Sequence, residues 1–468
     1  MSRLPKQSRR NRGTVLIVAM VVVFAIAAMV LSLTRQVGTQ SLVSANDLAV
    51  VKADAAERGA EQYVLSLLTD YRDSLPTMTE TEFSAVPVGD AYFWIVRPTF
   101  NDTNTPAWGL TDESGKMSLN TASASQIMTL PGMTEDLGLA IQQWRGQTDT
   151  TTTTDGTTSS SSSSSTGTVA VTDGVKNAPF ETVDELMMIP GMTHELLHGL
   201  PASQAAALAA NGGSTDWYQT HGVFDYFTAW GQWPNTAADG TARVSYNAAE
   251  QRDALNTLLS DKLGSAARAS EIINIITPAT GGGRGRPGRA TPVQLTDIFD
   301  LADRANLTTE ELAAIEDYVT NDSQATLVKG RINVNTAPRE VLLTLPNLAE
   351  SDVDTLIARR VEAAASDTPN SVAWVYDALK DKAVGLGNLI CGQGRQFSAD
   401  IVAVSHNGRA FKRVRIVVDS TSSPARVVYR RDLTDQGWPM DPSILDQLKA
   451  GTFAGGQTPT MSSATGAR

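Results

Sequence analysis

The sequence predicts an α+β protein in which a long N-terminal helix packs on an antiparallel sheet and a large helical insertion interrupts that sheet. Three observations support this fold class. An uncharged apolar run at residues 14–33 continues as a helical pattern to residue 68, strand patterns occur near both ends of the chain, and helical hairpins recur between them. Strands at both ends with helices between them indicate one sheet domain that is interrupted by an insertion.

The apolar run has the length and flanks of a membrane anchor. About 20 helical residues, each rising ~1.5 Å, span roughly the 30 Å hydrocarbon core of a bilayer. The residues before the run carry only positive charge, on Arg3, Lys6, Arg9, Arg10 and Arg12. Because positive flanks stay in the cytoplasm, the rest of the chain should lie outside it.

The end of the basic segment predicts a processing site. An ordinary signal peptide has an apolar core of about 7–15 residues before its cleavage site, and this run is longer. A short basic leader that ends in glycine and precedes a retained apolar helix is typical of prepilin-type processing. We therefore expect cleavage between Gly13 and Thr14, with an uncleaved signal anchor as the alternative. No proline follows until Pro76, and apolar residues recur at three- and four-residue spacings, which predicts one helix over residues 14–68.

Composition and charge restrict the partners. The chain of 468 residues has room for two or three domains beyond the anchor, and its formal net charge is −12. Without the five leader positives, 33 basic residues face 50 acidic ones, which disfavours nucleic acid and anionic lipid headgroups. The single Cys391 excludes an intramolecular disulfide and is expected to be a small buried residue. His194 and His198 lie four residues apart with no evident third ligand, so no metal site is predicted from them.

Strand patterns flank the helical part of the chain. Residues 91–99 are predicted to form a strand, and residues 108–119 a hairpin that turns at Asp112-Glu113-Ser114-Gly115. Asn407-Gly408 is a second hairpin turn, and the segment after Pro442 is partly helical. The final strands are expected at residues 397–404, 411–418 and 425–429.

A helical hairpin motif recurs in the middle of the chain. In the first copy, Asn120 and Thr121 are predicted to cap a short helix, and Pro131-Gly132-Met133 turns into a second helix that ends at Trp144. Further copies follow at residues 177–193 and 332–348, and a fainter one at 244–249 lacks the Pro-Gly turn. Two polar inserts, a Ser/Thr run and a Gly/Arg/Pro-rich stretch, are too polar to form a core.

These features together resemble one known family, the large minor pseudopilin of type II secretion systems (general secretion pathway protein K). The resemblance covers nearly the whole chain and rests on the leader and on the segments GKMSLN at 115–120, NAPFETVDELMMIPGMT at 177–193 and GRINVNTAP at 330–338. It implies a pilin-like fold with helix-hairpin-helix-like units in the insertion. It also implies a structural protein of the pseudopilus, single-pass in the inner membrane with its body in the periplasm, that serves the export of folded proteins.

The resemblance also implies the partners and further site residues. Other minor pseudopilins, the major pseudopilin, prepilin peptidase, and a secretin or the exported cargo are the expected partners, and no essential cofactor or enzymatic activity is expected. Counted from Thr14, the fifth residue is Val18, where most pilins and pseudopilins have Glu. The protein-K type lacks that Glu, which implies a place at the filament tip; alternatively, Val18 is merely part of an apolar anchor.

Calcium binding is the one family property that this sequence leaves unassigned. The resemblance implies an acidic stretch after the first helical hairpin, but residues 142–147 read QQWRGQ. Ca²⁺ requires several clustered oxygen ligands, and the nearby Asp112 and Glu113 alone do not make a site.

The predicted domain organisation follows from these patterns. It comprises a leader (1–13), the transmembrane and long helix (14–68), the first part of the sheet domain (69–119), the helical insertion (120–390, with disordered loops at 146–176 and 279–292), the final strands (391–441) and a C-terminal tail (442–468).

A membrane-tethered helix-hairpin-helix DNA-binding protein of competence or type IV pilus type is the alternative function. Such units approach phosphate with a Gly-hydrophobic-Gly turn. Here the second glycine is replaced by Thr134, Thr193 or Ala349. Acidic side chains that would repel phosphate surround the turns, at Glu135, Asp136, Glu195, Glu350 and Asp352. An enzyme is the least favoured class, since the sequence contains no phosphate-binding loop or G-x-S-x-G nucleophile motif.

Overall fold

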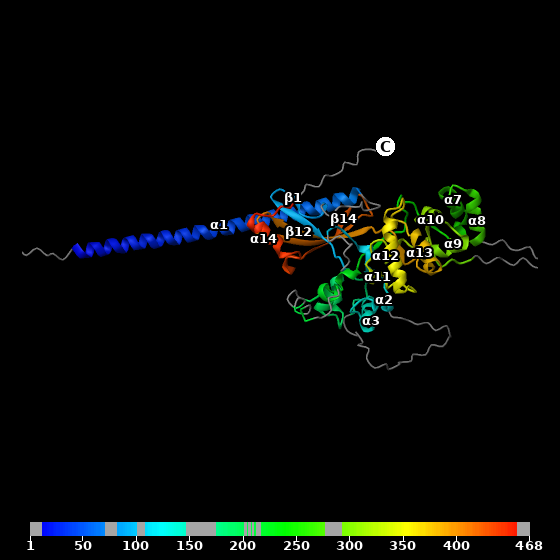
Figure 1. The fold of residues 1–468 in the computed structure, drawn as a ribbon, viewed down its shortest axis with the longest axis horizontal. Coiled ribbons are helices and arrows are strands. Elements are labelled where there is room, and N and C mark those ends of the chain that lie inside the picture. The colour runs from blue at the N-terminus through cyan, green and yellow to red at the C-terminus, as the bar shows by residue number, and fades with distance from the viewer. Residues whose placement is uncertain are drawn as a thin grey trace, which may run out of the picture.

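A helix of 59 residues, α1 (Arg12–Asp70), dominates the computed structural model, as the apolar periodicity predicts. The structure describes residues 12–70, 82–100, 108–146, 175–200, 217–276 and 293–455, together with residues 204, 207, 210 and 211. Most of the leader, most of both polar inserts and the end of the tail therefore lie outside the described residues. Figure 1 shows α1 projecting far beyond the body and joining it only along its C-terminal part.

The C-terminal part of α1 packs on a sheet through a row of small side chains. Ala49, Ala53, Ala56 and Ala60 are at most 2% exposed and recur at three- and four-residue spacings. This spacing places them on one helical face. Their small size lets the helix backbone approach the sheet closely, and Val64 and Leu68 extend the same buried face.

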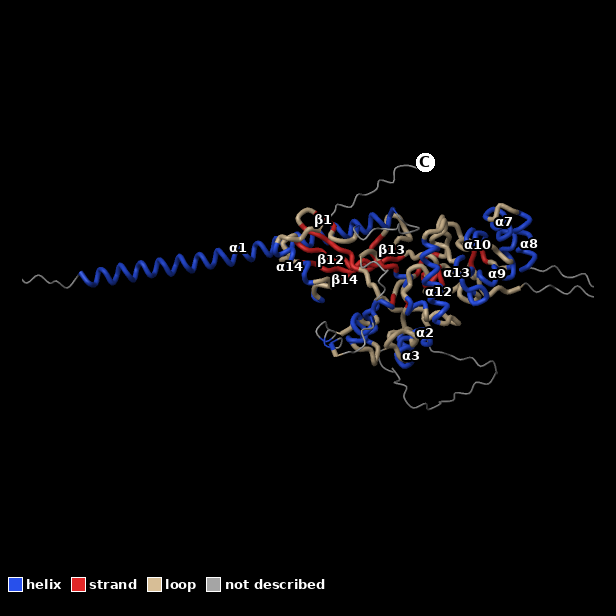
Figure 2. The backbone as a smooth tube through the Cα atoms, in the orientation of Figure 1, coloured by secondary structure: helices blue, strands red, loops and turns tan. Residues whose placement is uncertain are grey.

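The sheet combines strands from both ends of the chain. Its strand order is β1-β2-β12-β13-β14, every neighbouring pair is antiparallel, and β3 also pairs with β12. In register, Val402 lies opposite Trp94 on one side and Arg413 on the other. The predicted interruption of one sheet by an insertion is thus confirmed (Figure 2). The bounds are β1 (Val86–Val88), β2 (Ala91–Val96), β3 (Thr111–Asp112), β12 (Gln396–Ser405), β13 (Phe411–Asp419) and β14 (Arg426–Asp432).

Each face of this sheet has its own apolar core. Phe93, Ile401 and Ile416 join the buried face of α1 in one cluster. On the other face, Trp94 and Val404 pack with Leu448 of the C-terminal helix α14 (Pro442–Ala450). Successive side chains of a strand point to opposite faces, which is why Phe93 and Trp94 belong to different clusters.

Three local predictions for these strands differ in outcome. The final strands and the helix after Pro442 are confirmed, and the turn has Gly408 at φ +62°. The first strand ends at Val96, before the predicted residue 99. The predicted hairpin at 108–119 is wrong, because β3 pairs with β12 and β4 (Met117–Ser118) pairs in parallel with β5 (Phe227–Thr228). Between them, the 3-10 turn η3 (Glu113–Gly115) is buried, and Glu113 accepts from the remote Thr228.

The insertion is an assembly of short helices around a second, larger core. Three pairs of short strands, β6 with β9, β7 with β8 and β10 with β11, join its segments. In Figure 1, α7 to α10 lie at the end of the molecule opposite the free end of α1, and α2 and α3 lie apart from them in this view although their side chains belong to the same core cluster. The remaining bounds are α2 (Ala124–Ile127), α3 (Glu135–Trp144), η4 (Val183–Met188), α4 (His194–His198), α6 (Trp217–His221), η5 (Phe224–Tyr226), β6 (Gln232–Pro234), β7 (Val244–Ser245), η6 (Ala249–Gln251), α7 (Arg252–Lys262), α8 (Ala266–Ile276), α9 (Ile298–Ala305), α10 (Thr309–Ile315), β8 (Val319–Thr320), β9 (Leu327–Lys329), β10 (Ile332–Asn333), α11 (Arg339–Leu342), α12 (Glu350–Ala364), α13 (Ala373–Leu379), η7 (Lys380–Ala383), β11 (Ile390–Cys391) and η8 (Thr434–Gln436).

The predicted helical hairpins are present, with two corrections. The first helix is capped by Ser123 in a capping box with Gln126, not by Asn120 and Thr121. The Asn120 side chain instead binds the backbone of Phe180 and Ala229, and so joins the first two hairpins. The faint copy at 244–249 does introduce a hairpin, α7–α8, whose turn at Gly264 has φ +63°. An 11-residue helix precedes that turn, so it lies farther along the chain than in the other copies.

Candidate functional site

The three sequence-predicted site residues lie at the free end of α1. Gly13 and Thr14 have helical backbone in its first turn, and Val18 is 61% exposed. Because the first N–H groups of a helix have no intrahelical acceptor, the first turn opens at low cost. The predicted cleavage position thus lies at the N-terminal end of the described helix.

The apolar surface of α1 continues past the predicted membrane span. Large apolar side chains are exposed all the way from Val15 to Val51, and α1 is long and apolar enough to cross a membrane once. Beyond residue 33 the helix carries charges such as Arg35 and Asp47, yet it still exposes Val37, Leu42, Val43, Leu48, Val50 and Val51. An exposed apolar surface of this extent indicates an interaction site. Its position outside the uncharged run favours other helices over lipid as its neighbours.

Ion pairs fix the base of α1 to the body. Arg430 of β14 donates to Glu57 (2.9 Å) and Glu61 (3.3 Å), and Lys52 donates to Asp90 (2.8 Å). Burial raises the pKa of Glu57, and the adjacent Arg430 guanidinium opposes that rise. The alanine face and the Glu57–Arg430 pair join α1 to the sheet, whereas the exposed Lys52–Asp90 pair adds little.

A buried polar cluster joins the sheet to the insertion. Asp112 accepts hydrogen bonds from Asn333 (2.6 Å) and Thr336 (2.9 Å), which belong to the third hairpin motif. Neighbouring Glu113 binds Lys116 at 2.6 Å and also accepts from Thr228. Burial raises the pKa of Asp112; it also opposes ionisation of Glu113, but Lys116 holds the pKa of that carboxyl below its usual value. Both carboxylates are thus engaged by groups of the chain itself.

The segment where the resemblance implies acidic residues contains a buried cation instead. The Arg145 guanidinium donates to the backbone carbonyls of Leu119 and Ala122. Within the part of the chain that the structure describes, no group of three or more His, Cys, Asp or Glu side chains is arranged to hold a metal ion. The rings of His194 and His198 lie 4.9 Å apart, and His198 faces Asp184 at 3.8 Å. Cys391 is buried, as predicted, and burial raises the pKa of its thiol.

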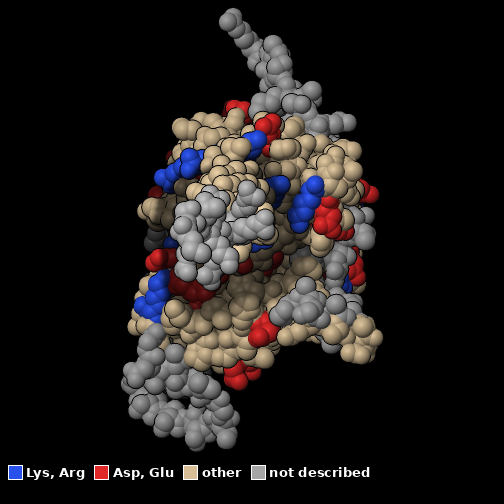
Figure 3. Space-filling model, turned by 90° about the vertical axis from the view of Figure 1, so that its left-hand side faces the viewer, with Lys and Arg blue, Asp and Glu red and all other residues tan. Residues whose placement is uncertain are grey.

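Sequence analysis missed a second charged junction between the sheet and the insertion. Asp400, in the middle of β12, binds Arg413 (2.7 Å) and Arg415 (3.2 Å), and Arg415 reaches Asp225 of the insertion (3.6 Å). Burial opposes ionisation of Asp400, but the two guanidinium groups hold its pKa below the usual value. An acidic residue within an otherwise apolar strand pattern was the available signal. Figure 3, a view of the side from which α1 projects, shows positive and negative side chains interspersed.

The turns of the first two hairpins pack against each other. A Cβ at Gly132 would meet Leu196 of the second hairpin at 2.9 Å, and one at Gly191 would meet Leu137 of the first at 3.4 Å. The hydroxyls of Thr134 and Thr193 accept from the N–H groups of these same leucines, respectively Leu137 and Leu196. Because turn surface and helix N-termini are used within the protein, this geometry favours mutual packing over phosphate binding.

In the third hairpin, other residues form the turn and occupy the N-terminus of the second helix. Asn347 takes the positive φ of the turn, at +63°, where the other two have glycine. The Asp352 carboxylate accepts from the Ala349 N–H at 2.9 Å and also binds Lys382. A carboxylate thus occupies the helix N-terminus at which a phosphate would bind.

Comparisons with known proteins are sparse. No family model and no curated protein matches the chain. Among solved structures, it is similar in part to a chain of the GspK-GspI-GspJ complex from the type 2 secretion system of enterotoxigenic Escherichia coli. The match has 15% identity and a TM-score of 0.16, and it covers 39% of this chain and 69% of that chain. A likeness this weak decides neither fold nor function by itself.

Proposed function

We propose that this protein is a minor pseudopilin of the type II secretion type, a structural component rather than an enzyme, with no essential cofactor. The observation that supports this best is the division of α1. Its first part exposes apolar side chains to solvent. Its second part is joined to an antiparallel sheet by the buried alanines from Ala49 to Ala60 and by the Glu57–Arg430 ion pair. A helix of this kind suits assembly with other helices and the transmission of force to a body.

The proposed mechanism follows from this geometry. In the membrane, α1 packs with the helices of the major pseudopilin and other minor pseudopilins through close apolar contact. Outside it, the exposed side chains between Val37 and Val51 continue the same packing. Since the base of α1 is joined to the sheet, movement of the helix bundle moves the periplasmic body. The insertion, at the opposite end from the free end of α1, then meets a secretin or the cargo (Figure 1).

Val18 supports a place at the tip of the filament. A carboxylate in the apolar layer is costly unless a charged partner neutralises it, and the proposed partner in pilins is the amine of a neighbouring subunit. Val18 offers no such carboxylate. A subunit with this residue needs no neighbour ahead of it, as expected at the tip.

Processing by prepilin peptidase tests the proposal. The full chain is expressed in membranes with and without the peptidase, and its intact mass and N-terminal sequence are determined. We expect a mature chain that starts at Thr14 with a methylated amine, and a Gly13→Leu variant that stays uncleaved.

Gly38→Ala is the matched control, because a Cβ at Gly38 has no other group within 4 Å; this variant should be processed normally. Normal processing of Gly13→Leu, or a cut after residue 33, would contradict the proposal.

A further inference from the structure

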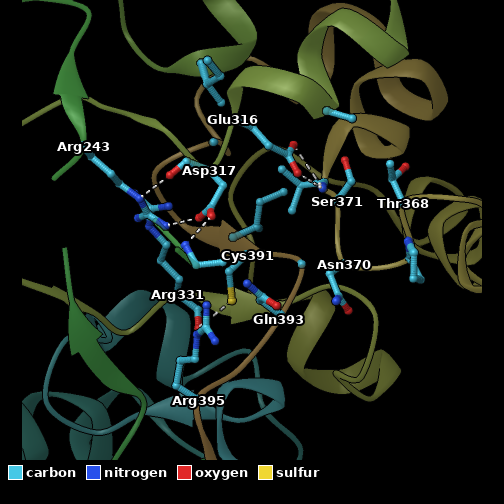
Figure 4. Close-up of a pocket in the computed structure, with 18 of the residues that line it drawn as sticks. Arg243, Glu316, Asp317, Arg331, Thr368, Asn370, Ser371, Cys391, Gln393 and Arg395 are labelled. Carbon is cyan, nitrogen blue, oxygen red and sulfur yellow. Dashed lines mark hydrogen bonds and ion pairs between the residues drawn. The ribbon is translucent and has the colours of Figure 1, made fainter. Parts of the chain in front are cut away.

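A polar cavity of about 350 Å³ lies within the insertion, away from α1 and the predicted processing site. The end of α10, the loop before α13 and the segment around β11 line it (Figure 4). Trp233 is an aromatic residue of the same lining. Its volume is at the lower end of the range for small-molecule sites. Three arginines line this cavity, Arg243, Arg331 and Arg395, although the chain as a whole is acidic.

One of these arginines is already neutralised. Arg243 donates to the Asp317 carboxylate at 2.6 Å and to the Asp317 carbonyl at 2.8 Å. The second carboxylate oxygen of Asp317 accepts from the Ala238 N–H at 2.7 Å. Both carboxylate oxygens of Asp317 are therefore engaged, and its charge is balanced by Arg243.

Arg331 is the arginine that lacks a partner. It is mostly buried, and among the residues that the structure describes, no acceptor or counter-ion holds its guanidinium. Burial lowers the pKa of Arg331, and the nearby positive charge of Arg243 lowers it further. A guanidinium has five donors, and those of Arg331 are not among the buried polar atoms that lack a hydrogen bond, so they are open to the cavity. An anion in the cavity would pair with these donors.

The state of Glu316 determines the charge of the cavity. Its carboxyl accepts from the Val372 N–H at 3.0 Å, and burial raises its pKa to about 8. Asp317 raises this pKa as well, while Arg243 lowers it, and the other ionisable groups that line the same cavity are Arg331, Asp367, Cys391 and Arg395. With Glu316 neutral at pH 7 and Asp317 paired with Arg243, Arg331 leaves an excess of positive charge on its side of the cavity.

We propose that this cavity is a binding site for a carboxylate, which pairs with Arg331 in a cavity that the polar side chains of Asn370 and Gln393 also line. A guanidinium matches the planar, two-oxygen geometry of a carboxylate. A single negative charge also balances the excess of the cavity. Such a carboxylate comes either from a free small acid or from the C-terminus of a polypeptide.

Binding is measured by ligand-observed NMR on the full chain in detergent micelles at constant ionic strength. The probes are acetate, N-acetyl-Gly-Gly and the amide of that peptide. We expect acetate or the free-acid peptide to bind at pH 7 and the amide not to bind. Arg331→Gln should weaken binding at least about tenfold, since a buried charged partner is lost. Arg409→Gln, at an exposed turn position, should leave it unchanged.

The pH dependence gives a second, independent readout. Because deprotonation of Glu316 removes the positive excess, wild-type affinity should fall about tenfold between pH 7 and pH 9. Glu316→Gln keeps the neutral form, so its affinity should change less than about twofold over that range. The comparison of Glu316→Gln with wild type still tests the proposal if Arg331→Gln does not fold. Circular dichroism shows whether Arg331→Gln is folded.

The two sources of carboxylate give different results. Equal binding of acetate and the peptide identifies a free small acid, and binding of the peptide alone identifies a chain terminus. Absence of binding by both, or equal binding to wild type and to a folded Arg331→Gln variant, overturns the proposal.

Discussion

The attachment of α1 to the sheet can be tested with one substitution at two adjacent positions. Ala56 is 0% exposed and belongs to the cluster that contains Phe93 and Ile401, whereas neighbouring Ala55 is exposed. Ala→Leu has nearly the same effect on helix propensity at both positions. Leucine at 56 must fit three more carbon atoms between helix and sheet, while leucine at 55 points into solvent.

The expected cost follows from the packing. Inserting extra methylenes into a filled core costs about 1–3 kcal/mol, because the surrounding side chains and backbone must shift. We take roughly 2 kcal/mol for Ala56→Leu, which corresponds to about a 30-fold change in a local opening equilibrium. For Ala55→Leu we expect a change within about 0.5 kcal/mol.

Amide hydrogen exchange of the full chain in detergent is the appropriate assay. A chain with several cores does not unfold in a single two-state step, so a local probe is preferable to one global unfolding curve. Peptides from β12, which α1 packs against, should exchange about 30-fold faster in Ala56→Leu, while peptides from α12 stay unchanged. If the β12 peptides of Ala56→Leu and Ala55→Leu exchange at rates within about threefold of each other, the alanine face does not hold α1 on the sheet as described.

Two further predictions concern the junctions of the sheet with the insertion. Asp400→Asn removes the counter-charge of Arg413 and leaves Arg415 only its longer contact with Asp225, and it should destabilise the body by about 3 kcal/mol. Asp90→Asn, in the exposed pair with Lys52, should have no measurable effect, and equal thermal shifts of the two variants would contradict the prediction. Gly394→Ala should cost about 2–3 kcal/mol, because its Cβ would lie 2.0 Å from Oδ1 of Asp112, which accepts from the Ser114 N–H, and would shift the whole carboxylate, including the oxygen that accepts from Asn333. Thermal unfolding compared with Gly38→Ala checks this, and equal midpoints would show that Asp112 moves freely.

Local sequence patterns were sufficient to predict the regular helices and strands. The apolar spacing in α1, the β-branched alternation in β12 and β13, and the turn at Asn407-Gly408 depend on residues close together in sequence. The repeated Pro-Gly-Met turns likewise marked the hairpins, and both hairpins use their glycine at positive φ. The order of these patterns also predicted that strands from both ends of the chain belong to one sheet.

Predictions failed where distant residues decide the local structure. Asp112 to Gly115 has the composition of an exposed turn, but Asn333, Thr336 and Thr228 bury it and pair β3 with β12. Asn120 has the residue type of a helix cap, but contacts with Phe180 and Ala229 occupy it, and Ser123 caps instead. In both cases a long-range hydrogen bond replaced the short-range one that the sequence suggested.

The long apolar helix and the order of helices and strands along the chain could thus be read from local sequence patterns, and the cleavage position stays a prediction from the same patterns. Which ionisable groups lie close together became visible only in the folded chain, as with Asp400 and its arginines or Arg331 and Glu316 in the cavity. The difference lies in the distance along the chain over which each interaction acts. Periodicity and turn geometry act over a few residues, whereas desolvation and charge pairing depend on neighbours that folding brings together from distant parts of the chain.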